Sequence, residues 1–332
     1  MHDKETARAD HMTPQAGVRP KYFNYLLRAI AVAGIPLLLT NILTSPVSKL
    51  GAGAWDHGHI LFFFAITWLA LDKANRQIGM RPLALAIFAL ALISIGIETI
   101  QSAIGRGFSF VDIYRNYLGA SLALLCHPGS IRTSPVLRKS LLTICILLIG
   151  VSVLPLARSA ITLLYGYSSF PVLSDFESPF EIERWDGDHL TVLQNEDRPG
   201  HSLSKLFDTG EFSSVTLNSF PADWRKFACL GFSAYSRQTE SISLELKIQD
   251  SRHRQSGYEY SDRFNQVLLI TPGRNDIVVS LDEVKNAPRG RKMDLGNIDS
   301  LSLFTQSLPE AVELRFDDFR LMERKHCSKK GA

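Results

Sequence analysis

Long apolar segments dominate the first half of the chain, and their lengths predict membrane helices. A helix that spans a bilayer needs about 20 apolar residues, with about 17 as the short limit. Five segments reach or approach this length, at about residues 22–43, 55–71, 82–104, 111–126 and 141–165. The pattern therefore predicts five transmembrane helices. The second and fourth are at the short limit, so we expect neighbouring helices to shield them from lipid.

Beyond residue 165 the apolar positions follow a period of two, which is typical of strands. The stretch SISLELKIQ places on one face Ile242, Leu244, Leu246 and Ile248. Similar stretches are NDIVVSL, IDSLSLF and AVELRF, and turn-rich pieces such as TPGRND separate them. About nine strands of this kind, with no convincing amphipathic helix, favour an all-β antiparallel sandwich or jelly roll.

The average composition hides these two unlike halves. The chain has 332 residues and a net charge of +3, and its mean hydropathy is +0.04. A near-neutral mean hydropathy that averages two unlike halves indicates a membrane domain joined to a water-soluble one. The small net charge gives no reason to expect a nucleic acid partner. We predict a cytoplasmic tail over 1–21, a transmembrane domain over 22–165, an exported β-sandwich over 166–324 and a basic tail over 325–332.

Lys and Arg residues concentrate in alternate loops, and this bias predicts the orientation in the membrane. They gather before the first segment, in the 72–82 loop and in the 127–140 loop, whereas the two other loops hold only Lys49 and Arg106. We therefore expect an integral protein of the inner (cytoplasmic) membrane with a cytoplasmic N-terminus and a periplasmic or extracellular C-terminal domain. The first segment is too long for a signal-peptide core, so we expect a retained anchor.

Several polar side chains interrupt the apolar helices near their predicted outer ends. Glu98 lies 16 residues after Pro82, which places it about 24 Å along the third helix. An ionisable group at the centre of a span costs roughly 2.5 kcal/mol or more, so it is usually retained for a function. We expect a single membrane polar site at the outer face, and its members are Asp56, His59, Glu98, Gln101, Arg106, Asp112 and Asn116.

The chemistry of this membrane polar site stays open. In an enzyme, Glu98 or Asp112 could act as acid or base while Arg106 holds a phosphate. Alternatively, Glu98–Arg106 and Asp112–His59 are structural pairs that hold a helix bundle together. The sequence contains no G-x-S-x-G elbow, no H-E-x-x-H, no phosphate loop and no paired-cysteine zinc motif. These three candidates therefore have no assigned catalytic role.

The motif around these residues resembles the VanZ-like membrane domain. The correspondence covers D-H-G-H from Asp56, E-x-x-Q from Glu98 followed by an arginine, and D-x-x-x-N-x-x-G from Asp112 to Gly119. It extends over about residues 24–127, with His57 at a position where lysine is frequent in that family. The resemblance implies a cell-envelope context and an association with glycopeptide resistance, and it implies no settled activity.

A cluster of aromatic and polar residues is the predicted ligand site of the exported domain. Sugars are held by an aromatic face together with polar groups that fix their orientation. Such groups occur together at Asp250, His253, Tyr258, Tyr260, Asp262, Arg263 and Asn265. The alternative is that the tyrosines are ordinary sheet residues and that Arg263 pairs with Asp262 at the surface.

The exported domain resembles galactose-binding-like jelly rolls of the kind found as glycan-binding modules. The resemblance rests on DFESPFEIERWDGD, LKIQDSRHRQSGYEYSDRFNQ, LDEVKNAPRGRKMDLGNIDSLSLF and ELRFDDFRL. It implies a cell-wall or lipid-linked glycan as partner. It also implies a candidate structural calcium, whose oxygen ligands would come from Glu177, Asp317 and Asp318. The alternative is that the two aspartates cap an edge strand.

Two cysteines of the exported domain, Cys229 and Cys327, make a disulfide chemically feasible. Cys327 lies in the basic tail ERKHCSKKGA, and this position argues against the bridge. The features together indicate a membrane protein of the cell envelope that recognises a glycan. A membrane enzyme acting on a lipid-linked or cell-wall glycan is the main alternative. An ion-coupled transporter is disfavoured, because the charges gather at the outer face and not at the midplane.

Overall fold

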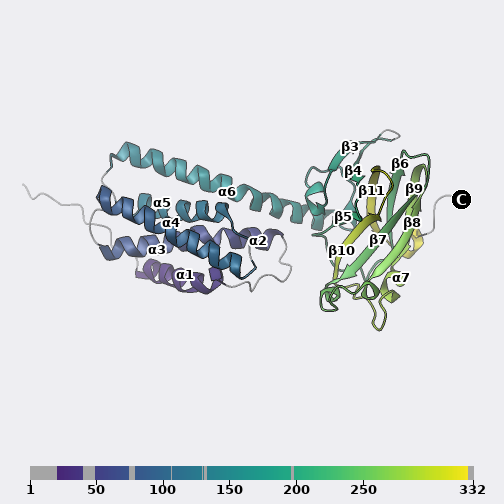
Figure 1. Cartoon of the computed structure of the whole chain (residues 1–332), viewed down its shortest axis with the longest axis horizontal. Helices are drawn as coiled ribbons and strands as arrows, with labels where there is room; N and C mark the ends of the chain where they lie inside the picture. Colours follow the sequence, from purple (N-terminus) through teal and green to yellow (C-terminus); the bar gives the residue numbers. More distant parts are fainter. Residues whose placement is uncertain are drawn as a thin grey trace, which may run out of the picture. The chain divides into compact units, whose positions relative to one another are not determined.

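The computed structural model describes residues 21–39, 49–74, 79–105, 107–128, 130, 133–195 and 198–327. Its N-terminal half is helical and its C-terminal half is an all-β sandwich (Figure 1). Two compact units divide the chain, and the division falls within one long helix, between Val153 and Leu154; residues 48–50 group with the second unit. We call them the helical unit and the β unit.

The helices form over the predicted apolar segments because leucine, alanine and phenylalanine dominate there. Their bounds are α1 Lys21–Leu39, α2 Lys49–Asp56, α3 Gly58–Ala74, α4 Met80–Ala103, α5 Phe110–Cys126 and α6 Pro135–Ser169. The short helix α2 is not among the predicted elements. Helix α5 begins at a true N-cap, since the Ser109 side chain accepts a hydrogen bond from the Asp112 amide at 3.2 Å.

Helices α3 and α5 approach each other closely because a glycine stands at their contact. A Cβ atom added at Gly119 would lie 2.2 Å from the Ile60 carbonyl oxygen and 3.0 Å from the Phe64 amide nitrogen. Any larger residue would push the two backbones apart. Small residues allow such contacts between membrane helices. The glycine of the D-x-x-x-N-x-x-G motif therefore sets the α3–α5 distance.

Two of the helices in the described residues are long and apolar enough to cross a membrane. They are Arg81–Ala103 in α4 and Pro135–Ser169, which is α6. Only 11% and 6% of their most apolar windows are buried within the protein. Helices form in the described parts of all five predicted segments. Among the described residues only two of these helices are long and apolar enough to cross a membrane, so the expectation of five crossings is not met there.

The β unit is a sandwich of two antiparallel sheets. One sheet has the order β3-β4-β11-β6-β9, with β1 on β11, and the other has the order β2-β5-β10-β7-β8. The strand bounds are β1 Val172–Ser174, β2 Trp185–Asp186, β3 Leu190–Gln194, β4 His201–Phe207, β5 Phe212–Leu217, β6 Cys229–Ser236, β7 Ile242–Asp250, β8 Phe264–Ile270, β9 Gly273–Ser280, β10 Ile298–Gln306 and β11 Val312–Met322. A short helix, α7 Leu281–Asn286, follows β9.

The period of two places the apolar side chains between the sheets. On β7, the side chains of Leu244, Leu246 and Ile248 are completely buried, as predicted. Strand β11 contributes Leu314 and Phe316 to the same core, then shifts register between Asp317 and Arg320. This bulge lets Phe319 return to the core while Asp317 and Asp318 stay on the outward side. The bulge therefore determines where the acidic pair lies.

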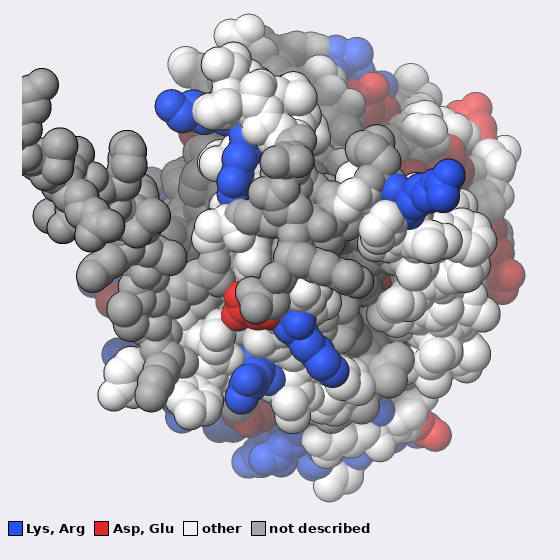
Figure 2. Space-filling model, turned by 90° about the vertical axis from the view of Figure 1, so that its left-hand side faces the viewer, with Lys and Arg blue, Asp and Glu red and all other residues white. Residues whose placement is uncertain are grey.

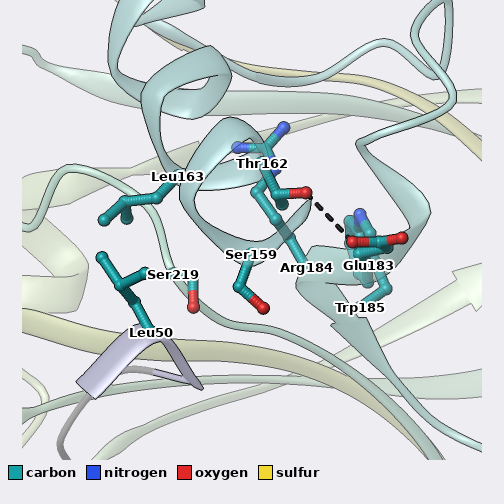
Figure 3. Close-up of a pocket in the computed structure, with 8 residues that line it drawn as sticks. All are labelled: Leu50, Ser159, Thr162, Leu163, Glu183, Arg184, Trp185 and Ser219. Atoms are coloured by element: carbon teal, nitrogen blue, oxygen red, sulfur yellow. Dashed lines mark hydrogen bonds between the residues drawn. The ribbon is translucent and has the colours of Figure 1, made fainter. Parts of the chain in front are cut away.

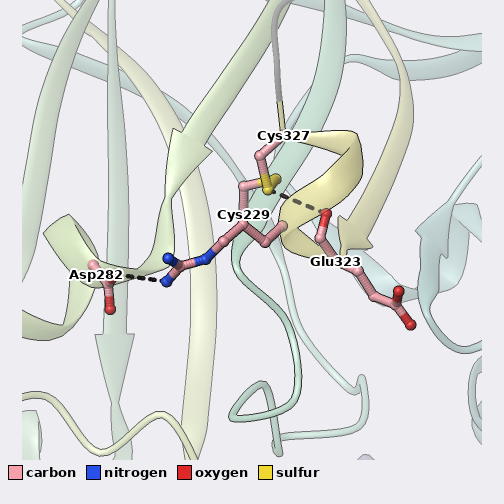
Figure 4. Close-up of a disulfide and its surroundings, with 5 residues drawn as sticks. Cys229, Asp282, Glu323 and Cys327 are labelled. Atoms are coloured by element: carbon pink, nitrogen blue, oxygen red, sulfur yellow. Dashed lines mark hydrogen bonds and ion pairs between the residues drawn. A yellow bond between two sulfur atoms is a disulfide. The ribbon is translucent and has the colours of Figure 1, made fainter.

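The disulfide between Cys229 and Cys327 is present, with the two Cα atoms 5.9 Å apart (Figure 4). The expectation that the basic tail would prevent it was wrong. A short 3-10 helix over Arg324–His326 follows β11 and places Cys327 beside the first residue of β6. The bridge therefore ties the end of the described chain to a central strand.

Removing this disulfide should destabilise the β unit. A bridge that closes a loop of 98 residues restricts the unfolded chain, and loss of a native bridge typically costs about 2–5 kcal/mol. The Cys229→Ser/Cys327→Ser double variant should therefore unfold at a lower temperature than the wild type. Cys126→Ser, which removes an unbridged cysteine, is the matched control. Equal melting temperatures for the double variant and the wild type would contradict the expectation.

Candidate functional site

Most of the predicted membrane polar site is gathered inside the helical unit. Asp56 is the last residue of α2 and His59 is the second residue of α3. Glu98 and Gln101 lie on α4, and Asp112 and Asn116 lie on α5. Arg106 lies outside the described residues. All of the described members except Asp56 are at least 95% buried: His59, Glu98, Gln101, Asp112 and Asn116. Side chains from three helices therefore share one buried polar cluster.

A chain of hydrogen bonds orients His59 within this cluster. The Asn116 side-chain nitrogen donates to the Ser94 hydroxyl at 3.1 Å, which leaves the Asn116 side-chain oxygen to face His59 Nδ1 at 2.9 Å. That oxygen can only accept, so His59 Nδ1 carries the proton and donates. The other ring nitrogen, Nε2, then faces Asp112 Oδ2 at 4.0 Å.

The two carboxylates of the cluster have different partners. Asp112 Oδ1 accepts a hydrogen bond from Arg115 at 2.5 Å, and Arg115 also lies 3.4 Å from Asp56. Glu98 Oε2 accepts a hydrogen bond from the Ser109 amide at 2.9 Å. Arg115 was not among the residues predicted from the sequence. Its position three residues after Asp112, on the same helical face, was the available signal.

The predicted sugar cluster of the β unit separates into a buried part and an exposed part. In the buried part, Arg291 donates to Asp250 at 2.6 and 2.8 Å and to Asp262 at 2.5 and 2.8 Å. His253 is fully buried beside this pair, and its Nδ1 lies 3.4 Å from Asp262. The hydrogen bonds from Arg291 lower the pKa of Asp262 to about 2. These charges hold the loop between β7 and β8 in place.

The exposed part consists of two tyrosines on this loop. Tyr258 and Tyr260 are each 61% exposed. The Arg263 guanidinium lies over the Tyr260 ring at 4.9 Å, and the Asn265 side chain donates to the Tyr260 carbonyl at 3.1 Å. Arg263 therefore packs on a tyrosine, while Asp262 is paired with Arg291.

The three candidate calcium ligands already have other partners. Glu177 accepts a hydrogen bond from the His201 amide at 2.8 Å and faces His201 Nδ1 at 3.1 Å. Arg198 donates to Asp318 at 2.8 Å and also pairs with Asp317. A calcium ion at these residues stays a prediction from the sequence.

A polar groove on the outward face of the six-stranded sheet was not predicted from the sequence. It is lined by Asn195, Arg198, Ser202, Ser233, Tyr235, Arg274, Arg315 and Asp317, and we call it the sheet groove. Cross-strand pairing places Tyr235 between Arg315 on β11 and Arg274 on β9. A wider hollow of about 990 Å³ continues from Ser233 and Arg274 toward Arg320 and Met322.

The sheet groove is unusual because its polar side chains are buried. Ser202, Ser233, Arg315 and Asp317 are each at least 91% buried although they point away from the core. The Ser202 hydroxyl makes no hydrogen bond within the described residues. Buried polar groups normally have partners. The groove itself encloses only about 30 Å³, and the wider hollow of about 990 Å³ beside it provides the space for a larger ligand.

Another hollow of about 330 Å³ lies where the last turns of α6 contact the sandwich (Figure 3). Leu50 and Leu163 form its apolar side, and Thr162 donates to Glu183 at 3.1 Å on the polar side. Arg158 also pairs with Glu183. These contacts lie within the β unit and pack the last turns of α6 against the sandwich, so we assign this hollow a structural role.

Comparison with known proteins establishes no family. No family model and no curated protein matches the chain. Solved structures include an exo-β-agarase, with TM-score 0.38 and 16% identity over 46% of this chain and 25% of that one. A family 11 carbohydrate-binding module of Clostridium thermocellum has TM-score 0.35 and 15% identity over 46% of this chain and 94% of that one. A cellulose-specific module, CBM28, has TM-score 0.34 and 12% identity over the same shares, 46% and 94%.

These similarities are too low for any functional inference. The matched part of this chain covers about a quarter (25%) of the length of the agarase. The VanZ-like resemblance, for which no family model gives a match, remains a prediction from its motif.

Ionisation of Asp317 should make the β unit less stable as the pH rises. Burial raises the pKa of Asp317 to about 6, above its ordinary value of 3.8. A carboxyl with a raised pKa in the folded state favours folding while protonated, so this stability is lost between about pH 4 and pH 6. Asp317→Asn should flatten the fall in melting temperature over that range. Asp276→Asn is the control, because the Asp276 side chain is 60% exposed. If the melting temperature of Asp317→Asn fell with pH as in the wild type, Asp317 would not be the cause of the lost stability.

Proposed function

We propose that this chain is an integral membrane protein whose β unit lies outside the cytoplasm and binds a glycan on the outward face of the six-stranded sheet, at the sheet groove and the wider hollow beside it. The observation that carries the proposal is this hollow of about 990 Å³, which shares Ser233 and Arg274 with the polar groove. The membrane and the orientation are separate parts of the proposal and have their own support.

Exposed apolar side chains on α4 and α6 support the membrane location. On α6, Leu147, Val151 and Leu154 are 61–63% exposed. On α4, Leu85 and Phe88 are 69% and 62% exposed. Continuous apolar surface of this kind is unfavourable in water by roughly 25 cal/mol per Å² and marks a surface that contacts lipid or another protein. Lipid suits α4 and α6 because their apolar lengths match a bilayer.

Charge and covalent chemistry support the orientation. Figure 2 looks onto the end of the helical unit where the described chain begins, and basic side chains exceed acidic ones on its near surface. Lys73 at the end of α3 and Arg138 at the start of α6 belong to the predicted cytoplasmic loops. The Cys229–Cys327 disulfide is typical of proteins in oxidising compartments. Both features favour an exported C-terminal domain.

The groups of the sheet groove suit a polyhydroxylated ligand. Tyr235 provides an aromatic ring, and Arg315 and Arg274 flank it on the neighbouring strands. The buried Ser202 hydroxyl and the Asp317 carboxylate add a donor and acceptors. Sugars combine apolar ring faces with hydroxyl edges, so an aromatic platform next to paired donors and acceptors binds both parts.

Removal of the Tyr235 ring should weaken glycan binding. We expect Tyr235→Ala to lower affinity for the best ligand on a cell-envelope glycan array at least about tenfold, which corresponds to roughly 1.4 kcal/mol. Tyr260→Ala is the matched control, because it removes an exposed tyrosine outside the groove. Melting temperatures show that both variants are folded. An array without signal for the wild type would refute glycan binding, and loss of binding only in Tyr260→Ala would move the site to the β7–β8 loop.

The orientation can be tested with a reporter that is active only in the cytoplasm. Fused after Ala332, the reporter should be silent, because the basic loops place the C-terminal domain outside. Fused to a chain that ends at Ala74, after α3, it should be active. Activity of the full-length fusion equal to that of the Ala74 fusion would overturn the orientation.

A further inference from the structure

We propose that the helical unit binds one divalent metal ion between His59, Glu98 and Asp112. Each side chain offers one ligand atom, and these three atoms lie within 4.8 Å of one another. Their residues are 0%, 0% and 5% exposed. Among the described residues, this is the one group of three or more histidine, cysteine, aspartate or glutamate side chains with such spacing. The proposal does not depend on glycan binding.

The hydrogen-bond chain through Asn116 prepares His59 for a metal. Because Nδ1–H donates to Asn116 Oδ1 at 2.9 Å, a neutral imidazole presents the lone pair of Nε2 toward Asp112 Oδ2, 4.0 Å away. A proton on Nε2 or a metal ion between the two groups removes the repulsion between these lone pairs, and only the metal ion can bind Glu98 at the same time. Metal-binding histidines usually donate their other N–H in this way, which fixes ring orientation and tautomer. Asn116 and Ser94 therefore act as positioning residues.

The charges around the cluster also favour a cation. Two carboxylates, Glu98 and Asp112, lie in a nearly water-free interior. Arg115 contacts Asp112 through Oδ1 only, and it also faces Asp56. Oδ2 of Asp112 remains directed at His59. A divalent ion at this position would add to the charge compensation that Arg115 gives Asp112, and it would lower the cost of burying two carboxylates side by side.

The His59–Asp112 separation is compatible with a first-row metal that accepts imidazole and carboxylate together, and the ligand atoms, which lie within 4.8 Å of one another, would move slightly closer to bind it. Zn²⁺ forms bonds of about 2.0–2.2 Å to nitrogen and carboxylate oxygen, so two ligands can be up to roughly 4.2 Å apart across the ion. The His59–Asp112 separation of 4.0 Å lies within this limit. One imidazole and two carboxylates match Zn²⁺ or Mn²⁺. Three protein ligands leave a coordination position open, as in sites that bind water or a substrate oxygen.

The test is metal binding by the full-length chain in detergent, purified with a tag that lacks histidine and stripped with a chelator. Titration with Zn²⁺ against a competing indicator should give one equivalent for the wild type. Glu98→Gln and Asp112→Asn keep the side-chain shape and remove a charged ligand, so each should weaken Zn²⁺ binding at least about tenfold. The melting temperature should rise with Zn²⁺ in the wild type and not in these variants.

Asp72→Asn is the matched control, because Asp72 contacts His127 at 3.0 Å in a histidine–carboxylate pair outside the cluster. It should bind Zn²⁺ as the wild type does. X-ray absorption of the Zn²⁺-loaded wild type supplies a readout that needs no variant, and nitrogen and oxygen ligands are expected. Sulfur ligands, equal binding by the Glu98→Gln and wild-type chains, or less than one equivalent in the wild type would overturn the proposal.

Discussion

The polar cluster of the helical unit depends on the close approach of α3 and α5. At Gly119 a Cβ atom would lie only 2.2 Å from the Ile60 carbonyl oxygen, so the helices can touch only where no side chain intervenes. His59 and Asn116 are each next to this contact, one residue before Ile60 and three before Gly119. Their side chains therefore meet, and the Asn116–Ser94 hydrogen bond joins α4 to the pair.

This contact explains why ionisable groups are tolerated within an apolar bundle. Glu98 and Asp112 are almost completely buried, yet each accepts a hydrogen bond from a nearby donor, Ser109 or Arg115. Burial of a charge is expensive unless opposite charge and hydrogen bonds replace water. Both partners come from α5 and its N-cap residue. The same arrangement, with His59 Nε2 directed at Asp112, is the basis of the proposed metal site.

The β unit uses its sheets differently. Apolar side chains fill the space between the sheets, and the outward face of the six-stranded sheet carries buried serine, arginine and aspartate. The bulge in β11 turns Asp317 and Asp318 outward while Phe319 stays in the core. Arg198 then reaches both aspartates from the loop before β4. A local irregularity in one strand thus links the core packing to the charge pattern of the groove.

The sequence by itself determined the two-part organisation, the positions of the helices and the core face of the strands. Apolar length and periodicity are local properties that can be seen along the chain itself. Glu98 follows Pro82 by 16 residues, and this spacing is enough to place Glu98 on the third predicted helix. The motif also named His59, Glu98, Asp112 and Asn116 together. The local pattern was misleading for Cys327, because the short 3-10 helix Arg324–His326 leads this residue to Cys229 in spite of the basic tail around it.

Only the tertiary structure decided which groups touch. Arg291 reaches Asp250 and Asp262 across 41 and 29 residues, so these two members of the predicted sugar cluster pair with an arginine that the sequence pattern did not indicate. Ser202, Ser233, Tyr235 and Arg315 come together because β4, β11 and β6 are neighbours in the sheet although they are distant in the chain. Strand order follows from packing of the whole core, and alternation within one strand carries no information about its neighbours.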